Sequence, residues 1–202
     1  MSKILISGYY GFANAGDEAM LTAIIESLRQ VEKNVELTVL SGNPEDTAAK
    51  HQVCSVYRFN PLGIIRAMKD SELIISGGGS LLQDVTSKRS LLYYLSIIGL
   101  GKFFGKKVML FAQGIGPIRA KWARKLTSLV CNEADLITVR DSESAAELIK
   151  MGVKPEKITV TADSVLSLNP VTKECGQYLL QEAGVDLTKP VIGISVRPWS
   201  GD

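Results

Sequence analysis

The chain is poor in the residues that build metal sites and disulfide frameworks. It has three cysteines and one histidine among its 202 residues. Cys54, Cys131 and Cys175 are odd in number and far apart, which predicts reduced, buried thiols in a cytoplasmic protein. His51 lies in a polar segment and is expected at the surface. One histidine and scattered cysteines indicate no zinc site, and we expect no metal.

The chain also lacks a dominant charge and a long apolar run. Its net charge is +2 with both signs dispersed, which argues against a nucleic-acid partner. No signal peptide precedes the short apolar run after Lys3. The most apolar segment, Leu91 to Phe104, is shorter than the roughly 20 residues that a membrane span takes. We expect a helix buried against a sheet there, and peripheral contact at the inner face of the membrane is the alternative.

What the chain does have is an alternation of apolar runs with helix-period segments. This predicts an α/β fold, a Rossmann-like, doubly wound parallel sheet with helices on both faces. The pattern lapses at 165–171, so we expect an amino-terminal domain at 1–168. Residues 169–202 are then a linker, a helix and the first strand of a truncated second domain, that strand starting at 191–197. The expected strands are 3–8, 35–41, 53–58, 72–76, 107–112, 135–140 and 157–162, and the expected helices are 17–31, 44–51, 61–69, 88–104, 120–133, 142–151 and 172–183.

The first expected strand runs into a glycine-rich turn and then a helix. Such a turn brings backbone N–H groups and the positive end of a helix dipole to one spot, as phosphate sites require. Gly11 and Gly16 have the spacing of a Walker A loop, but Asp17 and Glu18 stand where that loop needs Lys and Ser or Thr. We therefore do not expect an ATPase P-loop. The spacing of Gly8 and Gly11 does not fit the dinucleotide-binding pattern either.

Further motifs follow the other expected strands, at 77–79, at 113–116, at Arg140 and at Asp163. The carboxyl ends of parallel strands meet at one edge, so these motifs predict one shared crevice. The glycines either form an anion-binding concavity of N–H groups or are tight turns with room for helix packing. Arg140 suits bidentate capture of a carboxylate or phosphate, and a plain ion pair with Asp141 is the alternative.

Two interpretations of Asp17 are open: it is a helix N-cap, or it is a carboxylate at the floor of the crevice. In the second interpretation Asp17 binds sugar hydroxyls or accepts the proton of the attacking hydroxyl, which makes it the candidate catalytic residue. The candidate substrate-binding residues are Arg140, Gly8, Tyr9, Gly11, Asn14, Gly16, Gly77, Gly78, Gly79, Ser80, Asp84, Gln113, Gly114, Gly116 and Asp163.

Four stretches in this order resemble motifs of the polysaccharide pyruvyl transferase family. They are Gly8 to Ala19, matching G-Y-Y-G-F-x-N-x-G-D-E-A, then Ile75 to Asp84, Ala112 to Pro117 and Thr138 to Ser142. The family's proteins are longer, with two α/β halves in a glycosyltransferase-B-like architecture. The chain resembles the first half.

The resemblance implies transfer of the enolpyruvyl group of phosphoenolpyruvate to a cell-wall sugar, as a cyclic ketal. It implies that Arg140 holds the donor, that no cofactor is needed, and that the acceptor is a saccharide or a lipid-linked saccharide. The family's further donor-binding histidine and lysine lie in the second half, so the 202-residue chain is expected to be inactive alone. A sugar-nucleotide glycosyltransferase domain and a non-catalytic ligand-binding module are the rival hypotheses.

Overall fold

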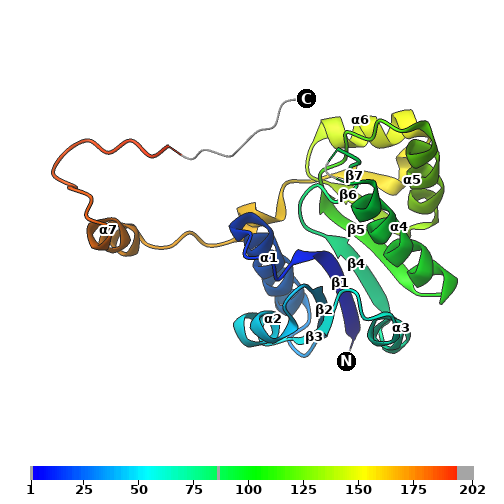
Figure 1. Cartoon of the computed structure of the whole chain (residues 1–202), viewed down its shortest axis with the longest axis horizontal. Helices are drawn as coiled ribbons and strands as arrows, with labels where there is room; N and C mark the ends of the chain where they lie inside the picture. The colour runs from blue at the N-terminus through cyan, green and yellow to red at the C-terminus, as the bar shows by residue number, and fades with distance from the viewer. Residues whose placement is uncertain (1, 86, 195–202) are drawn as a thin grey trace. The chain divides into compact units, whose positions relative to one another are not determined.

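The computed structural model describes residues 2–85 and 87–194, and the chain divides into two units, Met1–Leu168 and Asn169–Asp202. The described part of the first unit is a seven-stranded parallel sheet in the order β3-β2-β1-β4-β5-β6-β7 (Figure 1). The predicted Rossmann-like α/β fold is therefore confirmed. The strands are β1 (Lys3–Tyr10), β2 (Glu36–Ser41), β3 (Cys54–Tyr57), β4 (Leu73–Gly77), β5 (Lys107–Gln113), β6 (Leu136–Val139) and β7 (Ile158–Val160).

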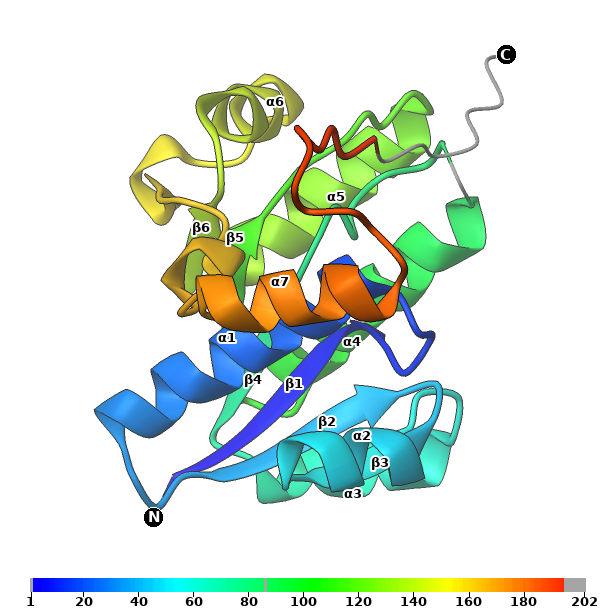
Figure 2. The same cartoon turned by 90° about the vertical axis from the view of Figure 1, so that its left-hand side faces the viewer.

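The direction of the chain across the sheet reverses after β3. Figure 2 shows β1 between β2 and β4. Strands β2 and β3 are added on one side of β1 and the later strands on the other, so the topological switch point lies between β1 and β4. Right-handed crossovers then place α1 and α2 on one face and the later helices on the other. The helices are α1 (Ala15–Val31), α2 (Pro44–His51), α3 (Pro61–Asp70), α4 (Lys88–Phe103), α5 (Lys121–Glu133), α6 (Ser142–Met151) and α7 (Lys173–Glu182), with short 3₁₀ turns at η1 (Pro155–Lys157) and η2 (Ser164–Ser167).

The central strands are buried on both faces, as parallel strands usually are. Leu5 of β1 belongs to a core shared with Ile74 and the helices α3 to α6. The next residue, Ile6, belongs to a second core that includes Ile24 of α1. The central strands therefore contact helices on both faces of the sheet.

Short polar side chains begin several helices. Asn14 accepts the backbone N–H groups of Gly16 and Asp17, so Asn14 is the N-cap of α1. The expectation that Asp17 caps this helix is wrong, because Asp17 lies inside its first turn. There its negative charge is favourable beside the positive end of the helix dipole.

The segment expected to be a buried helix forms α4. Leu91, Leu95 and Ile98 are buried in the larger core, while Leu92 and Phe103 are exposed. No helix in the described part of the chain is long and apolar enough to cross a membrane.

The expectations for two of the cysteines and for residues 191–194 also fail. Cys131 is buried as expected, and burial raises the pKa of its thiol to about 12, but Cys54 and Cys175 are exposed. In the second unit α7 is present, yet residues 191–194 form no strand, and the rest of the expected strand at 191–197 lies outside the described residues.

Candidate functional site

The strands at the switch point are tied together by Tyr10. Its hydroxyl donates to the carbonyl oxygen of Gly77 at 2.6 Å, and its side chain is fully buried. A Cβ atom on Gly8 would lie 2.3 Å from the Tyr10 ring, and one on Gly78 would lie 2.7 Å from its hydroxyl. Gly8, which lies inside β1 and not after it, and Gly78 therefore make room for Tyr10. The packing interpretation holds for both.

The glycine turn after β4 faces Asp17. Gly79 has φ of +68°, and a Cβ atom there would lie 2.9 Å from the Asp17 carboxylate. Its N–H donates to Met20 Sδ at 2.9 Å and its carbonyl accepts from Gly114 N–H at 3.2 Å. The N–H and carbonyl groups of Gly79 are thus occupied by α1 and by the loop after β5, and the partly exposed Asp17 carboxylate lies beside the turn. A Cβ on Gly77 would meet Ile24 of α1, so that glycine serves helix packing.

The first glycine turn is held by Glu18. Gly11 has φ of +77° and donates its N–H to Glu18 Oε1 at 2.8 Å. The other carboxylate oxygen lies 3.6 Å from Nε2 of His51, whose side chain is only 9% exposed. The expectation that His51 is a surface residue is wrong. Gly16 donates its N–H to Asn14 Oδ1. The N–H groups of both glycines in this turn therefore already have acceptors within the chain.

Arg140 lies directly after β6, with its side chain 35% exposed. Its Nε donates to Asp141 at 3.2 Å, Nη1 to Asp163 at 3.5 Å, and Nη2 to Ser80 at 3.3 Å. A guanidinium has five N–H donors, so among the described residues one donor on each terminal nitrogen is left for a ligand. The predicted residues Arg140, Ser80 and Asp163 are therefore brought together from three separate loops.

The Arg140 side chain is positioned by its neighbours. A Cβ atom on Gly114 would lie 2.8 Å from the guanidinium carbon, so glycine at this position lets the group approach the β5 loop. Asp141 also caps α6 by accepting the Ser144 N–H at 2.7 Å. The hydrogen bonds from Ser144, and next those from Arg140, hold the pKa of Asp141 below its ordinary value, so the carboxylate stays ionised. The predicted plain ion pair with Asp141 exists, but it orients the guanidinium and leaves part of it exposed.

Three other candidates have structural partners. Gln113 is buried and donates to the backbone oxygen and hydroxyl of Ser76, both at 2.9 Å. Asp84 accepts the N–H groups of Arg119 and Ala120 at 2.9 Å; these bonds lower its pKa although burial acts in the opposite direction. The Gly116 N–H donates to the Leu82 carbonyl at 2.8 Å. Gln113 thus connects β5 to β4, while Asp84 and Gly116 connect neighbouring loops.

The charge of Asp17 reaches two buried phenols. Burial raises the pKa of Tyr10, and Asp17 raises it further. Burial also raises the pKa of Tyr94, with a smaller upward contribution from Asp17. The Asp17 carboxylate lies against Gly79, and the Arg140 guanidinium donates to the next residue, Ser80. Asp17 and Arg140 therefore approach the same loop at the carboxyl edge.

Sequence reasoning missed a second arginine at this edge. Arg58 follows β3 and is 4% exposed among aromatic side chains, of which Tyr9 and Phe12 stack on each other at 4.3 Å. Arginine between two aromatic residues, Tyr57 and Phe59, at the end of an expected strand was the available signal.

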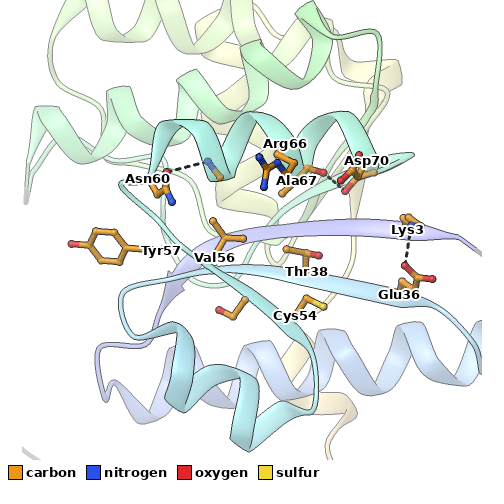
Figure 3. A pocket seen from close by; sticks show the side chains of 13 residues that line it. Lys3, Glu36, Thr38, Cys54, Val56, Tyr57, Asn60, Arg66, Ala67 and Asp70 are labelled. Atoms are coloured by element: carbon orange, nitrogen blue, oxygen red, sulfur yellow. Dashed lines mark hydrogen bonds and ion pairs between the residues drawn. The ribbon is translucent and has the colours of Figure 1, made fainter.

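A separate pocket of about 420 Å³ lies along the outer part of the sheet. Figure 3 shows α3 lying above β2 and β3 across it, with Arg66 and Asp70 on the helix and the ion pair of Lys3 and Glu36 at one end. It is lined by mixed polar and apolar side chains and contains neither Arg140 nor the glycine turns. We therefore place the candidate site at the loops and not in this pocket.

Solved structures share this fold at low sequence identity. The Anabaena protein HepE in complex with UDP-glucose matches with a TM-score of 0.57 at 13% identity, covering 91% of this chain and 50% of that one. A glycosyltransferase from Rickettsia africae matches at 0.56 and 11%, covering 94% and 51%. UDP-GlcNAc 2-epimerase from Neisseria meningitidis bound to UDP-GlcNAc matches at 0.54 and 13%, covering 90% and 50%. The chain thus spans about half the length of these structures.

These likenesses define the class of the fold, a Rossmann-like α/β unit of the kind found in glycosyltransferases and sugar-nucleotide epimerases. No curated protein matches the chain in direct sequence comparison. The chain belongs to the polysaccharide pyruvyl transferase family, whose model matches residues 14–194. The resemblance drawn from the four sequence motifs is therefore confirmed.

Proposed function

We propose that this chain takes part in transferring a pyruvyl group from phosphoenolpyruvate to a saccharide, with Arg140 as the donor-binding residue. The observation that carries the proposal is the Arg140 guanidinium, oriented by Asp141, Asp163 and Ser80 yet 35% exposed at the carboxyl edge. Phosphoenolpyruvate carries a carboxylate and a phosphate, both of which suit a guanidinium. Membership of the family supports this choice of donor.

The reaction requires a proton on the enol carbon, an oxocarbenium-like centre, loss of a proton from the attacking hydroxyl, and departure of phosphate. Asp17 is our candidate for contacting the acceptor, because its carboxylate lies over the Gly79 turn at the carboxyl edge. A carboxylate there can bind the attacking hydroxyl or accept its proton. Arg140 would hold the donor and stabilise its negative charge.

Binding of the donor is the first test. Isothermal titration calorimetry of the 202-residue chain with phosphoenolpyruvate should show binding that Arg140→Ala removes. Arg66→Ala is the matched control, because Arg66 is an exposed arginine on α3, away from the Arg140 group. Absence of binding by the chain and by the whole natural protein would overturn the donor assignment.

Turnover is the second test and separates the rival hypotheses. The whole natural protein, given phosphoenolpyruvate and saccharide acceptors, should release inorganic phosphate and form a ketal. A glycosyltransferase would instead release a nucleotide from a sugar nucleotide, and a binding module would protect its ligand without turnover. Either result would replace the proposal.

A further inference from the structure

Arg58 is a buried cation at the carboxyl end of β3. Its backbone N–H donates to the Ser41 carbonyl at 2.9 Å, which fixes the residue beyond the end of β2. Its Nη2 donates to the Tyr94 hydroxyl at 3.3 Å. Within the described part of the chain, Nε and Nη1 are buried and have no hydrogen-bond partner. Buried donors without acceptors cost free energy, so this arrangement calls for an explanation beyond folding.

Aromatic side chains surround this guanidinium. Their faces attract the cation and offset part of its desolvation, but a ring is a poor substitute for an oxygen acceptor. Burial raises the pKa of the Tyr93 and Tyr94 hydroxyls, while the Arg58 charge acts in the opposite direction. Neither phenol therefore supplies a negative charge near neutral pH. The ring centroids within 5.9 Å of the guanidinium carbon belong to Tyr9, Phe12, Phe59, Tyr93 and Tyr94, and with Arg58 they form what we call the Arg58 cluster.

The solvent side of the Arg58 cluster is formed by Tyr9, near the end of β1, and by Phe12 and Phe59, which lie in loops. Tyr9 is 40%, Phe12 41% and Phe59 61% exposed. Phe12 lies in the turn where Gly11 and Ala13 both have positive φ, outside any helix or strand. Rotation of these exposed rings would open the buried nitrogens to a ligand without disturbing the sheet.

We propose that the Arg58 cluster is a second anion-binding subsite, which takes the diphosphate of a diphosphate-linked saccharide. The two unpartnered nitrogens, Nε and Nη1, do not share one edge of the planar guanidinium. A carboxylate grips a single edge with its two oxygens, whereas a diphosphate spreads its oxygens over two tetrahedral groups and can reach both nitrogens. The exposed stacked pair of Tyr9 and Phe12 offers a face for the sugar ring.

This inference rests on the proposed function in one respect, that the saccharide is the acceptor. β3 and β6 lie on opposite sides of the β1 and β4 switch point in the sheet order. Arg58 and Arg140 therefore flank the Asp17 and Gly79 region from two sides. Separate sites let two anionic substrates bind with their repulsion reduced by distance and by one cation each.

Calorimetry with inorganic pyrophosphate as the probe tests the subsite. The 202-residue chain should bind pyrophosphate, and Arg58→Lys should weaken that binding about tenfold or more, because lysine lacks the planar set of donors. Arg66→Lys, which changes an exposed arginine on α3, should leave it unchanged. Arg140→Lys should weaken phosphoenolpyruvate binding and spare pyrophosphate. No binding of pyrophosphate, or equal affinity for Arg58→Lys, would overturn the subsite.

Hydrogen–deuterium exchange and the affinity of a saccharide diphosphate test the subsite independently of the Arg58→Lys variant. If Arg58→Lys does not fold, hydrogen–deuterium exchange of the unchanged chain should show slower exchange at 9–14 and 57–62 with pyrophosphate. Protection confined to 138–142 would place the anion at Arg140 and refute the subsite. A short-chain alkyl diphosphate saccharide should bind more tightly than free pyrophosphate. Equal affinities would refute the saccharide part of the inference. A chain that binds pyrophosphate but not phosphoenolpyruvate would refute only the proposed function.

Discussion

The Tyr10 hydroxyl donates to the Gly77 carbonyl at 2.6 Å. This bond joins β1 to β4, the two neighbouring strands at which the strand order of the parallel sheet switches from one side of β1 to the other. The residue two positions before Tyr10 is Gly8, and a Cβ atom there would lie 2.3 Å from the Tyr10 ring and 2.5 Å from the Gly77 oxygen. The bond and the glycine therefore depend on each other. Together they set the position from which both glycine turns begin.

Gly8→Ala should destabilise the chain. A new methyl group cannot enter the space without displacing Tyr10, and overpacking of this kind costs about 1–3 kcal/mol. Gly99→Ala is the matched control, because Gly99 lies in α4 and a Cβ there meets nothing within 4 Å. That control should be neutral or stabilising by about 0.5–1 kcal/mol, the helix preference of alanine over glycine. Urea unfolding of both variants measures this, and equal stabilities would contradict the packing role of Gly8.

The alternation of apolar strands and helical segments was enough to predict the fold. Parallel strands buried on both faces leave a strong pattern, as at Leu5 and Ile6, which serve two cores. The sequence motifs also placed Arg140 beside Ser80 and Asp163, because the strands that carry them end at one edge of the sheet.

Other features could not be read from sequence because they depend on distant partners. The spacing of the glycines does not reveal that Gly8 accommodates the ring of Tyr10. A polar neighbourhood suggested an exposed His51, but the helix that carries it faces Glu18 of α1. The burial of Arg58 likewise requires α4 to fold back over the sheet and supply Tyr93 and Tyr94.

Replacing Arg140 by alanine should weaken phosphoenolpyruvate binding by about 2–4 kcal/mol, the range for losing one partner of a charge-assisted contact. Arg140→Lys should recover little, because lysine cannot hold the planar arrangement that Asp141, Asp163 and Ser80 orient. Calorimetry gives the affinities. Unchanged affinity in both variants would show that the donor binds elsewhere.

Asp135 should make the stability of the chain depend on acid pH. Burial acts to raise its pKa, but hydrogen bonds from Lys102 and the Val108 N–H, with help from Lys107, lower the pKa to about 2 from an ordinary 3.8. Because the folded pKa is lowered, the stabilisation is present above the unfolded value and is lost as pH falls from about 4 to about 2.

Asp135→Asn should therefore remove about 1 kcal/mol of unfolding free energy near pH 7, a figure reduced for solvent screening of this partly exposed group. The loss should shrink as pH falls from about 4 and should vanish only below about pH 2, once Asp135 is protonated in the folded chain as well. Glu26→Gln, at an exposed position of α1, is the charge-matched control. Denaturant unfolding at several pH values measures the difference, and a constant gap between Asp135→Asn and the unchanged chain at every pH would show that the ion pairs are not its cause.

Asp17→Asn should separate an acceptor role from a structural one. Asn14 is the N-cap of α1, so the change leaves the cap in place and removes a favourable charge from the first turn, worth about 0.3–1 kcal/mol. An amide of the same shape still fits over Gly79 but cannot accept a proton from a sugar hydroxyl. Turnover in the whole natural protein should then fall by about 10²-fold or more, the usual contribution of a general base, while phosphoenolpyruvate affinity stays the same. Glu26→Gln supplies the control for loss of a charge on the same helix. Full activity in Asp17→Asn would mean that Asp17 only shapes the turn, and the proton would have to leave through another group.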